Sequence, residues 1–271
     1  MSVGRLVVCP TPIGNLEDVT LRVLSALREA DVVACEDTRR TRVLLDRYGV
    51  SASLVSYHEH NERDRAAELV RRMSSGAVVA LVSDAGMPLV SDPGFVLVQA
   101  CVAAGLAVEV LPGPSAALAA LVASALPAER WRFEGFLPRR KGELRTLFAD
   151  LDETLVAFES PRRLAASLGV LAELDPERPV AVCRELTKLH EEVVRGRARE
   201  VAERYEKEAP RGEVVLVVGA ASAPVPDLES ALAAVRRLVD GGAKPRVAAG
   251  VVAELTGARA NELYRALNEE R

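Results

Sequence analysis

The sequence predicts an α/β protein whose first half folds as a mostly parallel sheet with helices on both faces. Short apolar runs rich in β-branched residues alternate with helix-periodic stretches, as in sheets that are covered on both sides. Each run ends in a loop rich in Gly, Pro, Asp or Ser. The predicted strands are residues 6–9, 31–35, 53–57, 78–82 and 108–111. The predicted helices are residues 18–29, 38–48, 62–74, 95–104 and 115–125.

The rhythm of the chain changes near residues 128–132, which indicates a domain boundary. Beyond it, strands are predicted at residues 132–136, 154–158, 180–183, 191–195 and 213–218. Helices are predicted at residues 142–151, 162–174 and 198–206. The excess of strands over helices favours a mixed sheet in an α+β domain. We therefore expect one domain at residues 1–127 and a second at residues 128–219.

A stretch rich in Pro, Ala and Ser, residues 220–226, predicts a linker. The remainder, residues 227–271, predicts a small appendage of three short helices. Residues 247–267 also resemble a helix-turn-helix, but short helices joined by Thr-Gly are common without any nucleic-acid role. The pattern therefore favours a plain helical appendage.

The overall charge argues against a protein whose whole surface binds a polyanion. The 271 residues include 35 Lys or Arg and 39 Asp or Glu, a formal net charge of −4. Contacts to phosphates need clustered cations, and one such cluster exists: residues 130–145 hold six Lys or Arg against two Glu. Any nucleic-acid site is therefore expected to be local.

Composition also bears on location and on metal or disulfide chemistry. No run approaches the roughly 18–20 apolar residues of a membrane span, and no signal-peptide pattern is present, so we expect a soluble cytoplasmic protein. The cysteines are few, far apart and in apolar contexts, which predicts buried thiols rather than disulfides or a zinc site.

The loops after the first five strands hold the unusual residues, and all five are expected to face one ligand cleft, because ligands bind at the carboxyl ends of parallel strands. The loop at residues 10–15 has a single glycine and two prolines, which suits a shaped wall better than a phosphate cradle. The loop at residues 83–94 contains two turn motifs and favours a ligand loop, in which Asp84 could anchor an amine or a ribose hydroxyl. Ser115 is either a helix cap or part of a helix start that receives a carboxylate.

Two further loops, residues 36–40 and 58–63, are dense in charge. Asp37 and Asn61 could simply cap the helices that follow. His58, Glu59 and His60 could suggest a metal, but no third nitrogen or thiolate ligand has suitable spacing. We therefore predict no metal site.

Taken together, these motifs resemble the family of ribosomal RNA small subunit methyltransferase I, a branch of the tetrapyrrole methylase superfamily. The matching segments are residues 10–16, 36–39, 58–61, 83–94, 112–116, 134–138 and 184–188, in order, within a match over about residues 5–219. The first loop of the tetrapyrrole enzymes usually reads Gly-x-Gly-x-Gly-Asp, whereas here it reads Pro-Thr-Pro-Ile-Gly-Asn. That departure argues against a tetrapyrrole substrate.

The resemblance implies S-adenosylmethionine-dependent methylation of a cytidine ribose 2′-hydroxyl in the decoding region of 16S ribosomal RNA. It implies a two-domain tetrapyrrole-methylase-like fold with the cofactor between the domains, a homodimer, and 16S RNA or the small ribosomal subunit as partner. Carried over by position, it assigns the cofactor to Pro12, Asp84, Met87, Ser115, Ala116 and Leu186.

For such a reaction the hydroxyl proton needs an acceptor within reach. The candidates in the charged loops are Glu36, Asp37, His58, Glu159, Glu185 and Lys188. We predict Asp37 as the base, with Arg39 orienting a phosphate and Glu185 as the reserve. The residues expected to contact RNA phosphates are Arg39, Arg40, Arg139, Arg140, Lys141, Arg162 and Arg163.

Three alternatives remain open. A methyltransferase of the same superfamily could act on a tetrapyrrole or another RNA. A nicotinamide-dependent oxidoreductase is suggested by Glu36, which lies about twenty residues after the first loop, but the glycines of a dinucleotide fingerprint are missing. A non-catalytic RNA-binding module is the third, although it leaves the acids at the strand ends without a purpose.

Overall fold

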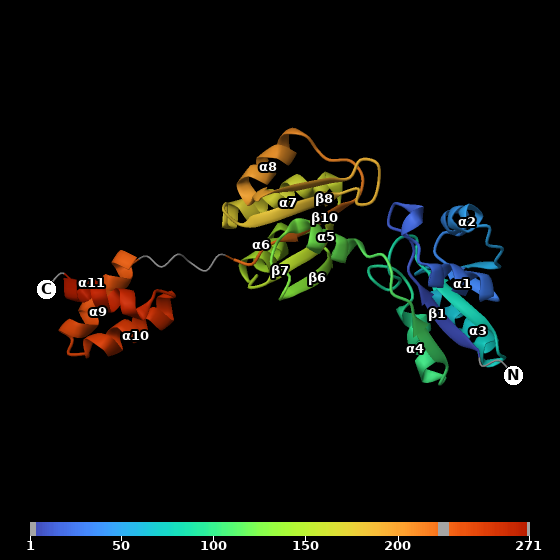
Figure 1. Ribbon diagram of the computed structural model, residues 1–271, viewed down its shortest axis with the longest axis horizontal. Helices are drawn as coiled ribbons and strands as arrows, with labels where there is room; N and C mark the ends of the chain where they lie inside the picture. Colours follow the sequence, from blue (N-terminus) through green and yellow to red (C-terminus); the bar gives the residue numbers. More distant parts are fainter. Residues whose placement is uncertain (1–3, 222–227, 270–271) are drawn as a thin grey trace. The chain divides into compact units, whose positions relative to one another are not determined.

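The computed structural model describes residues 4–221 and 228–269 of the chain. It divides into two compact units, Met1–Ala220 and Ala221–Arg271 (Figure 1). The predicted linker spans residues 220–226, and its residues 222–226 lie outside the described residues. No helix within the described residues is long and apolar enough to cross a membrane.

The first sheet has five strands, all parallel, in the order β3-β2-β4-β1-β5. Its strands are β1 (Arg5–Cys9), β2 (Val32–Cys35), β3 (Leu54–Ser56), β4 (Val78–Val82) and β5 (Ala107–Val110). Its helices are α1 (Leu21–Glu29), α2 (Thr38–Arg47), α3 (Glu62–Ser74) and α4 (Phe95–Ala103). The predicted parallel α/β layout is confirmed.

Side chains that alternate between the two faces of each strand form a hydrophobic core on each face of this sheet. Val7 and Cys9 join the α1 and α2 side chains in one core, while Leu6 and Val8 join those of α3 and α4 in the other. Successive side chains of a strand point to opposite faces, so a continuous apolar run feeds both cores.

The first helix begins later than predicted. Residues Leu16–Asp18 form a separate 3-10 helix, and α1 begins at Leu21. The hydroxyl of Thr20 accepts a hydrogen bond from the Val23 amide at 3.1 Å and so caps the new start. Capping at Thr20, rather than the apolar period, therefore decides where this helix begins.

The second sheet is mixed, as predicted, with the order β6-β7-β10-β8-β9. Its strands are β6 (Trp131–Phe136), β7 (Thr154–Glu159), β8 (Pro179–Arg184), β9 (Glu192–Arg197) and β10 (Val214–Val218). Its β6 and β7 are parallel, and the other three pairings are antiparallel. Helices α6 (Lys141–Ala149), α7 (Pro161–Leu174) and α8 (Ala198–Lys207) share one core on one face.

Helix α5 (Ala116–Ser124) packs on the opposite face of this second sheet. Its Ala117, Ala120 and Leu121 are buried against β7, β8 and β10 side chains such as Val156 and Val217. The helix follows the last strand of the first sheet and covers the second, so it links the two sheets. The boundary predicted after residue 127 remains a prediction.

The C-terminal unit contains three helices within the described residues, in agreement with the sequence. They are α9 (Leu228–Asp240), α10 (Pro245–Thr256) and α11 (Ala260–Glu269). Val235, Val252 and Leu263 contribute to a small core of their own. Gly257 ends α10 with φ +73°, a left-handed conformation that glycine adopts without strain.

Candidate active site

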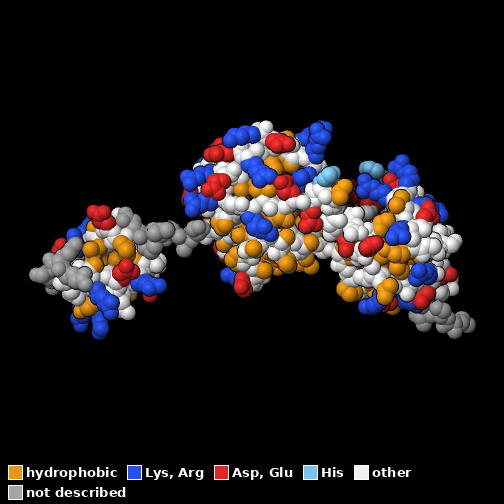
Figure 2. All heavy atoms as spheres, turned by 45° about the horizontal axis from the view of Figure 1, so that its top comes forward, with side chains coloured by type: hydrophobic (Ala, Val, Ile, Leu, Met, Phe, Trp, Pro, Cys, Tyr) orange, Lys and Arg blue, Asp and Glu red, His pale blue; other side chains and the backbone are white. Residues whose placement is uncertain are grey.

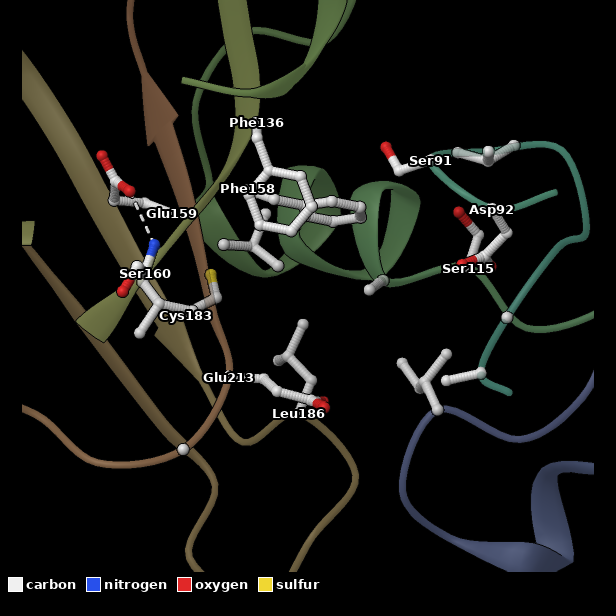
Figure 3. Close-up of a pocket in the computed structure, with 18 of the residues that line it drawn as sticks. Ser91, Asp92, Ser115, Phe136, Phe158, Glu159, Ser160, Cys183, Leu186 and Glu213 are labelled. Atoms are coloured by element: carbon white, nitrogen blue, oxygen red, sulfur yellow. Dashed lines mark hydrogen bonds between the residues drawn. The ribbon is translucent and has the colours of Figure 1, made fainter. Parts of the chain in front are cut away.

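A cavity of about 350 Å³ opens where the loops of the first sheet meet the second sheet (Figure 3). Its volume lies in the range of about 300–1,000 Å³ that is usual for small-molecule sites. Apolar side chains on its wall include Ile13, Met87, Phe136, Phe158 and Leu186. Polar side chains on it include Ser91, Asp92, Ser115, Glu159, Ser160 and Glu213. A mostly apolar wall with a few polar groups is typical of a cofactor or substrate site.

Only some of the loops expected at one cleft reach this cavity. The loops after β1, β4 and β5 contribute lining residues, whereas those after β2 and β3 contribute none among the residues described. The strand order gives the reason: β4, β1 and β5 are neighbours, while β2 and β3 continue to the other edge. The prediction of a single cleft formed by all five loops is therefore wrong for two of them.

The loops after β1 and β4 are joined by an antiparallel bridge between Thr11 and Gly86. The amide of each donates to the carbonyl of the other at 2.9 Å. The Thr11 hydroxyl also donates to the Ser83 carbonyl at 3.0 Å, and the Ser83 hydroxyl donates to the Gly86 carbonyl at 3.0 Å. These bonds make the two loops one rigid wall.

That wall meets the second sheet at Gly14, where the backbones come very close. A Cβ atom at this position would lie 2.5 Å from Lys188 Cγ and 2.7 Å from Thr187 Oγ1. The next residue, Asn15, donates its amide to Thr187 Oγ1 at 3.0 Å. The position therefore favours glycine, because a Cβ would have to displace the side chains of Thr187 and Lys188 or the loop at residues 186–188.

Strained backbone is concentrated in the two loops that border the cavity. Outside glycine, positive φ occurs among the described residues at Leu89, Ser91, Ala125, Glu185 and Thr187. Four of these five belong to the loops at residues 83–94 and 185–188, and Ala125 ends helix α5. Such conformations cost about 1–3 kcal/mol each and are found mostly where function requires a fixed shape.

An aromatic surface forms the top of the cavity in Figure 3. A bulge in β6 at Gly135, with φ +72°, precedes Phe136, which stays 62% exposed. The Phe136 ring contacts the Phe158 ring edge-on, with centroids 5.5 Å apart. An exposed ring on the wall of a site offers a surface on which a base can stack.

The structure brings together four of the six residues expected at the cofactor. Met87, Ser115, Ala116 and Leu186 all line the cavity. The Ser115 hydroxyl also caps α5, accepting from the Leu118 amide at 3.5 Å. The predicted role of this helix start in receiving a carboxylate stays a prediction. Ile13 also lines the cavity and was not among the predicted site residues, although its place in the first loop was a signal.

Pro12 and Asp84 lie outside the cavity lining. The Asp84 carboxylate instead accepts a hydrogen bond from the Asp37 amide at 3.0 Å and lies 3.5 Å from the Arg40 guanidinium. These contacts tie the loop after β2 to the loop after β4. The carboxylate of Asp84 therefore has a structural role, and its predicted contact with the cofactor stays a prediction.

Asp37 has both carboxylate oxygens engaged. Oδ1 accepts from the backbone amide of Arg39 at 2.8 Å, which caps α2, and the Arg39 guanidinium binds both oxygens at 3.1 and 2.8 Å. Hydrogen bonds from Arg39 lower the pKa of Asp37 to about 2. Such a carboxylate is a weak proton acceptor, and Asp37 is absent from the cavity lining.

Glu185 belongs to a charged cluster beside the cavity. Its carboxylate accepts from Lys188 Nζ at 2.8 Å and from the Glu213 amide at 2.8 Å, and these bonds lower the pKa of Glu185. Lys188 Nζ also contacts Glu213 at 3.0 Å. The cluster holds the loop at residues 185–188 against the start of β10.

Glu159 is buried at the end of β7, and its partners account for both oxygens. It accepts from the Ser160 amide and the Ser167 hydroxyl, each at 2.6 Å, and pairs with Arg163 at 2.5 Å. Arg163 also donates to the Leu137 carbonyl at 3.2 Å. These contacts fix the turn between β7 and α7 and occupy Arg163, which the sequence placed on an RNA phosphate.

Asp92 and Glu213 are acids on the cavity wall that were not predicted from the sequence, and Asp92 has the more perturbed environment. Burial, followed by the negative charge of Glu36, raises the pKa of Asp92 to about 6, although a hydrogen bond with the Ser83 side chain opposes the shift. The signal in the sequence was its place in the second turn of the loop at residues 83–94, where the ordinary interpretation was an N-cap.

The predicted RNA-contacting cations differ in how far they are already paired. Arg139 and Arg162 are exposed and have no ion pair among the described residues. Arg140 pairs with Glu143 and Lys141 with Glu173, each at 3.0 Å on the surface. Surface pairs contribute little, about 0–1 kcal/mol, so a phosphate can replace the carboxylate partner.

No cluster of metal-ligating side chains was found among the described residues. The four cysteines are free and buried, as predicted. Burial raises the pKa of the Cys183 thiol, which lies on the cavity wall, to about 11. This thiol is therefore protonated near neutral pH and is a poor nucleophile.

Residues 5–202 match the model of the tetrapyrrole (corrin/porphyrin) methylases, and the chain belongs to this family. The chain is also similar to proteins named ribosomal RNA small subunit methyltransferase I. That of Mesorhizobium japonicum is 46% identical over 267 residues, which cover 96% of this chain and 90% of the relative. That of Mycobacterium tuberculosis is 45% identical over 278 residues, which cover all of this chain and 97% of the relative.

Solved structures share the fold. A uroporphyrin-III C-methyltransferase from Thermus thermophilus, complexed with S-adenosyl homocysteine, is 26% identical with a TM-score of 0.57, covering 80% of this chain and 97% of that one. A diphthine synthase is 17% identical with a TM-score of 0.62, covering 79% of this chain and 89% of that one. The predicted tetrapyrrole-methylase-like fold is thereby confirmed.

The close contact at Gly14 predicts that Gly14→Ala destabilises the first unit by about 1–3 kcal/mol, because the new methyl group forces the loop at residues 186–188 outward. Chemical denaturation measures the free energy of unfolding. Gly169→Ala is the control, since a Cβ in the middle of α7 meets nothing within 4 Å and should be neutral or stabilising by up to about 1 kcal/mol. Equal stability of Gly14→Ala and wild type would disprove the close contact.

Proposed function

We propose that this protein transfers a methyl group from S-adenosylmethionine to the 2′-hydroxyl of a cytidine ribose in the decoding region of 16S ribosomal RNA. The strongest support is the sequence identity of about 45%, over nearly the full chain, to proteins named ribosomal RNA small subunit methyltransferase I. The cavity between loops and sheet adds a site in which the reaction can occur. Such RNA is cytoplasmic, and we expect the protein to act there.

The cavity suits S-adenosylmethionine, the methyl donor of this proposal. The bound S-adenosyl homocysteine of the Thermus thermophilus relative is the donor's product, and that relative shares the fold. In this chain Met87 and Leu186 offer apolar contact for the adenosine, and the start of α5 at Ser115 and Ala116 suits the carboxylate. Pro12 and Asp84 remain proposed cofactor neighbours through the loops they hold.

The acceptor nucleotide would enter over the aromatic surface of the cavity. The exposed ring of Phe136 is placed for stacking by a cytosine, which would bring the attached ribose into the cavity. A hydroxyl reacts in line with the methyl group when about 3–3.5 Å separates the two atoms. Stacking and burial would supply this positioning.

The phosphates of the RNA are assigned to cations at exposed loop ends and helix starts. We propose Arg39, Arg40, Arg139, Arg140, Lys141 and Arg162 for this role. Arg39 is 89% exposed even while it binds Asp37, so its guanidinium can also face an RNA phosphate. Positive and negative side chains are mixed over the surface in Figure 2, which fits a local RNA contact rather than a single basic face.

A homodimer is part of the proposal, and α5 offers a surface for it. The side of this helix that faces away from the second sheet exposes Leu118 and Val122, one turn apart, with Val122 80% exposed. Exposed apolar neighbours of this kind are common where protein partners meet.

The function is tested by incubating 16S RNA and small ribosomal subunits with the protein and S-adenosylmethionine, then mapping ribose methylation by mass spectrometry. We expect one added methyl group on a cytidine ribose. Calorimetric titration with S-adenosylmethionine and with NAD separates the alternatives. Binding of neither would favour an RNA-binding module, and binding of NAD alone an oxidoreductase. Methylation of a porphyrinoid instead of RNA would contradict the proposed substrate.

Replacing Arg139, Arg140 and Lys141 together by Ala should weaken RNA binding and flatten its dependence on salt, because fewer counterions are released. The measurement is the RNA dissociation constant at several salt concentrations, with S-adenosylmethionine affinity as the control that should not change. Ala at Arg197, Arg199 and Arg204, which form surface ion pairs at or near α8, removes the same three positive charges and is the matched control. An unchanged salt slope would remove residues 139–141 from the RNA contact.

The substitution Val122→Asp should convert the dimer to a monomer, since it places a charge in the apolar patch. Light scattering after size exclusion measures the mass of the particle. Val43→Asp is a control, because Val43 is also exposed but lies on α2. A dimer that survives Val122→Asp would show that subunits meet elsewhere.

A further inference from the structure

Asp92 lies on the cavity wall formed by the loop between β4 and α4. It lines the cavity together with Met87 and Ser115. Figure 3 shows Asp92 and Ser115 next to one another, on the side opposite Glu159 and Ser160. An acid on this wall is within the space that the cofactor and the acceptor would share.

The backbone holds Asp92 in a fixed position. Leu89 and Ser91, just before it, both have positive φ, at 73° and 65°, and Gly94 follows with φ +141°. From the other sheet, a Cβ at Gly135 would lie 3.6 Å from Ser91 Oγ, so the bulge that precedes Phe136 borders the same loop. The acid and the aromatic surface therefore belong to neighbouring segments of the wall.

The charges around Asp92 are predominantly negative. Glu36 and Asp84 face it from the loops after β2 and β4 and disfavour its ionised form. Beyond them, Arg40 and His58 interact with Glu36, but no cation pairs with Asp92 among the residues described. Glu159 and Glu213 lie on the cavity wall as well. Burial in this setting raises the pKa of Asp92 to about 6, near the pH at which a base has to act.

Three of the four other carboxylates considered for the reaction are already bound to cations, and the fourth, Glu36, does not line the cavity. Asp37 is held by Arg39, Glu185 by Lys188, and Glu159 by Arg163. A carboxylate bound to a cation loses basicity, and the capping contact at Asp37 has this effect. Asp92 differs from all three because no ion pair holds it among the residues that the structure describes.

We propose that Asp92 accepts the proton of the ribose 2′-hydroxyl during methyl transfer, an assignment that rests on the proposed function. In this step the O2′–H bond breaks and its proton passes to a carboxylate oxygen of Asp92. A lone pair of O2′ forms the new O–CH₃ bond as the S–CH₃ bond breaks, and that electron pair stays on sulfur. The products are the 2′-O-methyl ribose, S-adenosylhomocysteine and a protonated Asp92, which returns the proton to water.

The test compares single-turnover methylation of 16S RNA by wild type, Asp92→Asn and Asp92→Glu across the pH range around the pKa of Asp92. Asp46→Asn is the matched control, because Asp46 lies exposed on α2 and outside the cavity lining. Calorimetry measures S-adenosylmethionine binding by each variant. The amide of Asn keeps the shape of the side chain but accepts no proton at these pH values.

We expect Asp92→Asn to bind S-adenosylmethionine like wild type and to methylate at least about 100-fold more slowly, the usual effect of losing a general base. The wild-type rate constant should rise about tenfold per pH unit up to pH about 6 and then level off, since Asp92 must be ionised to act. Asp92→Asn should lack this rise, and Asp92→Glu should restore part of the rate.

Several outcomes would overturn the assignment. One is an Asp92→Asn rate close to wild type; another is a loss of cofactor affinity with an unchanged rate at saturation, which would make Asp92 a cofactor ligand. If Asp92→Asn does not fold, the wild-type profile decides, because a flat profile around pH 6 excludes Asp92 as the base. If wild type methylates no ribose at all, the proposed function itself fails, and the control variant will show the same.

Discussion

The antiparallel bridge between Thr11 and Gly86 is the contact on which the site depends. It joins the loops that follow β1 and β4, two neighbouring strands of the parallel sheet, through paired hydrogen bonds of 2.9 Å. The joined loops then meet the second sheet at Gly14, where the absence of a side chain permits close approach. Without the bridge, each loop would lose its partner, and the cavity would lose the wall that contains Met87 and Asp92.

Environment separates the acids of this region into two groups. Asp37 and Glu185 receive hydrogen bonds from cations and backbone amides, which lower their pKa, and they stabilise the loops that contain them. No cation pairs with Asp92 within residues 4–221 and 228–269, and burial together with nearby Glu36 raises the pKa of Asp92. The same side-chain chemistry therefore serves structure at some positions and is left available for reaction at another.

Much of the fold could be predicted from sequence because its signals are local. Apolar strands such as Val78–Val82 are buried on both faces, and their continuous hydrophobicity identifies them as parallel strands. The loops at the carboxyl ends of β4 and β5 were a correct guide to Met87 and Ser115 on the cavity wall, whereas Leu186 follows β8 and was named from the family resemblance. Capping of α2 by Asp37 was one interpretation of the sequence and is observed. The ion pairs of Asp37 with Arg39 and of Arg163 with Glu159 were not predictable, because a charged residue at a strand end looks the same whether it binds a partner or a ligand.

By itself, the sequence determined the order of strands and helices, the parallel and mixed sheets, and the family, since each is encoded in periodicity or in motifs read along the chain. Tertiary structure alone decided which loops share a cavity, since that depends on the order of strands within the sheet. It also decided that α5 covers the second sheet and that, in the part of the chain that the structure describes, Asp92 forms no ion pair. These features arise between residues far apart in the chain, where packing and the distance between charges are set by the whole fold.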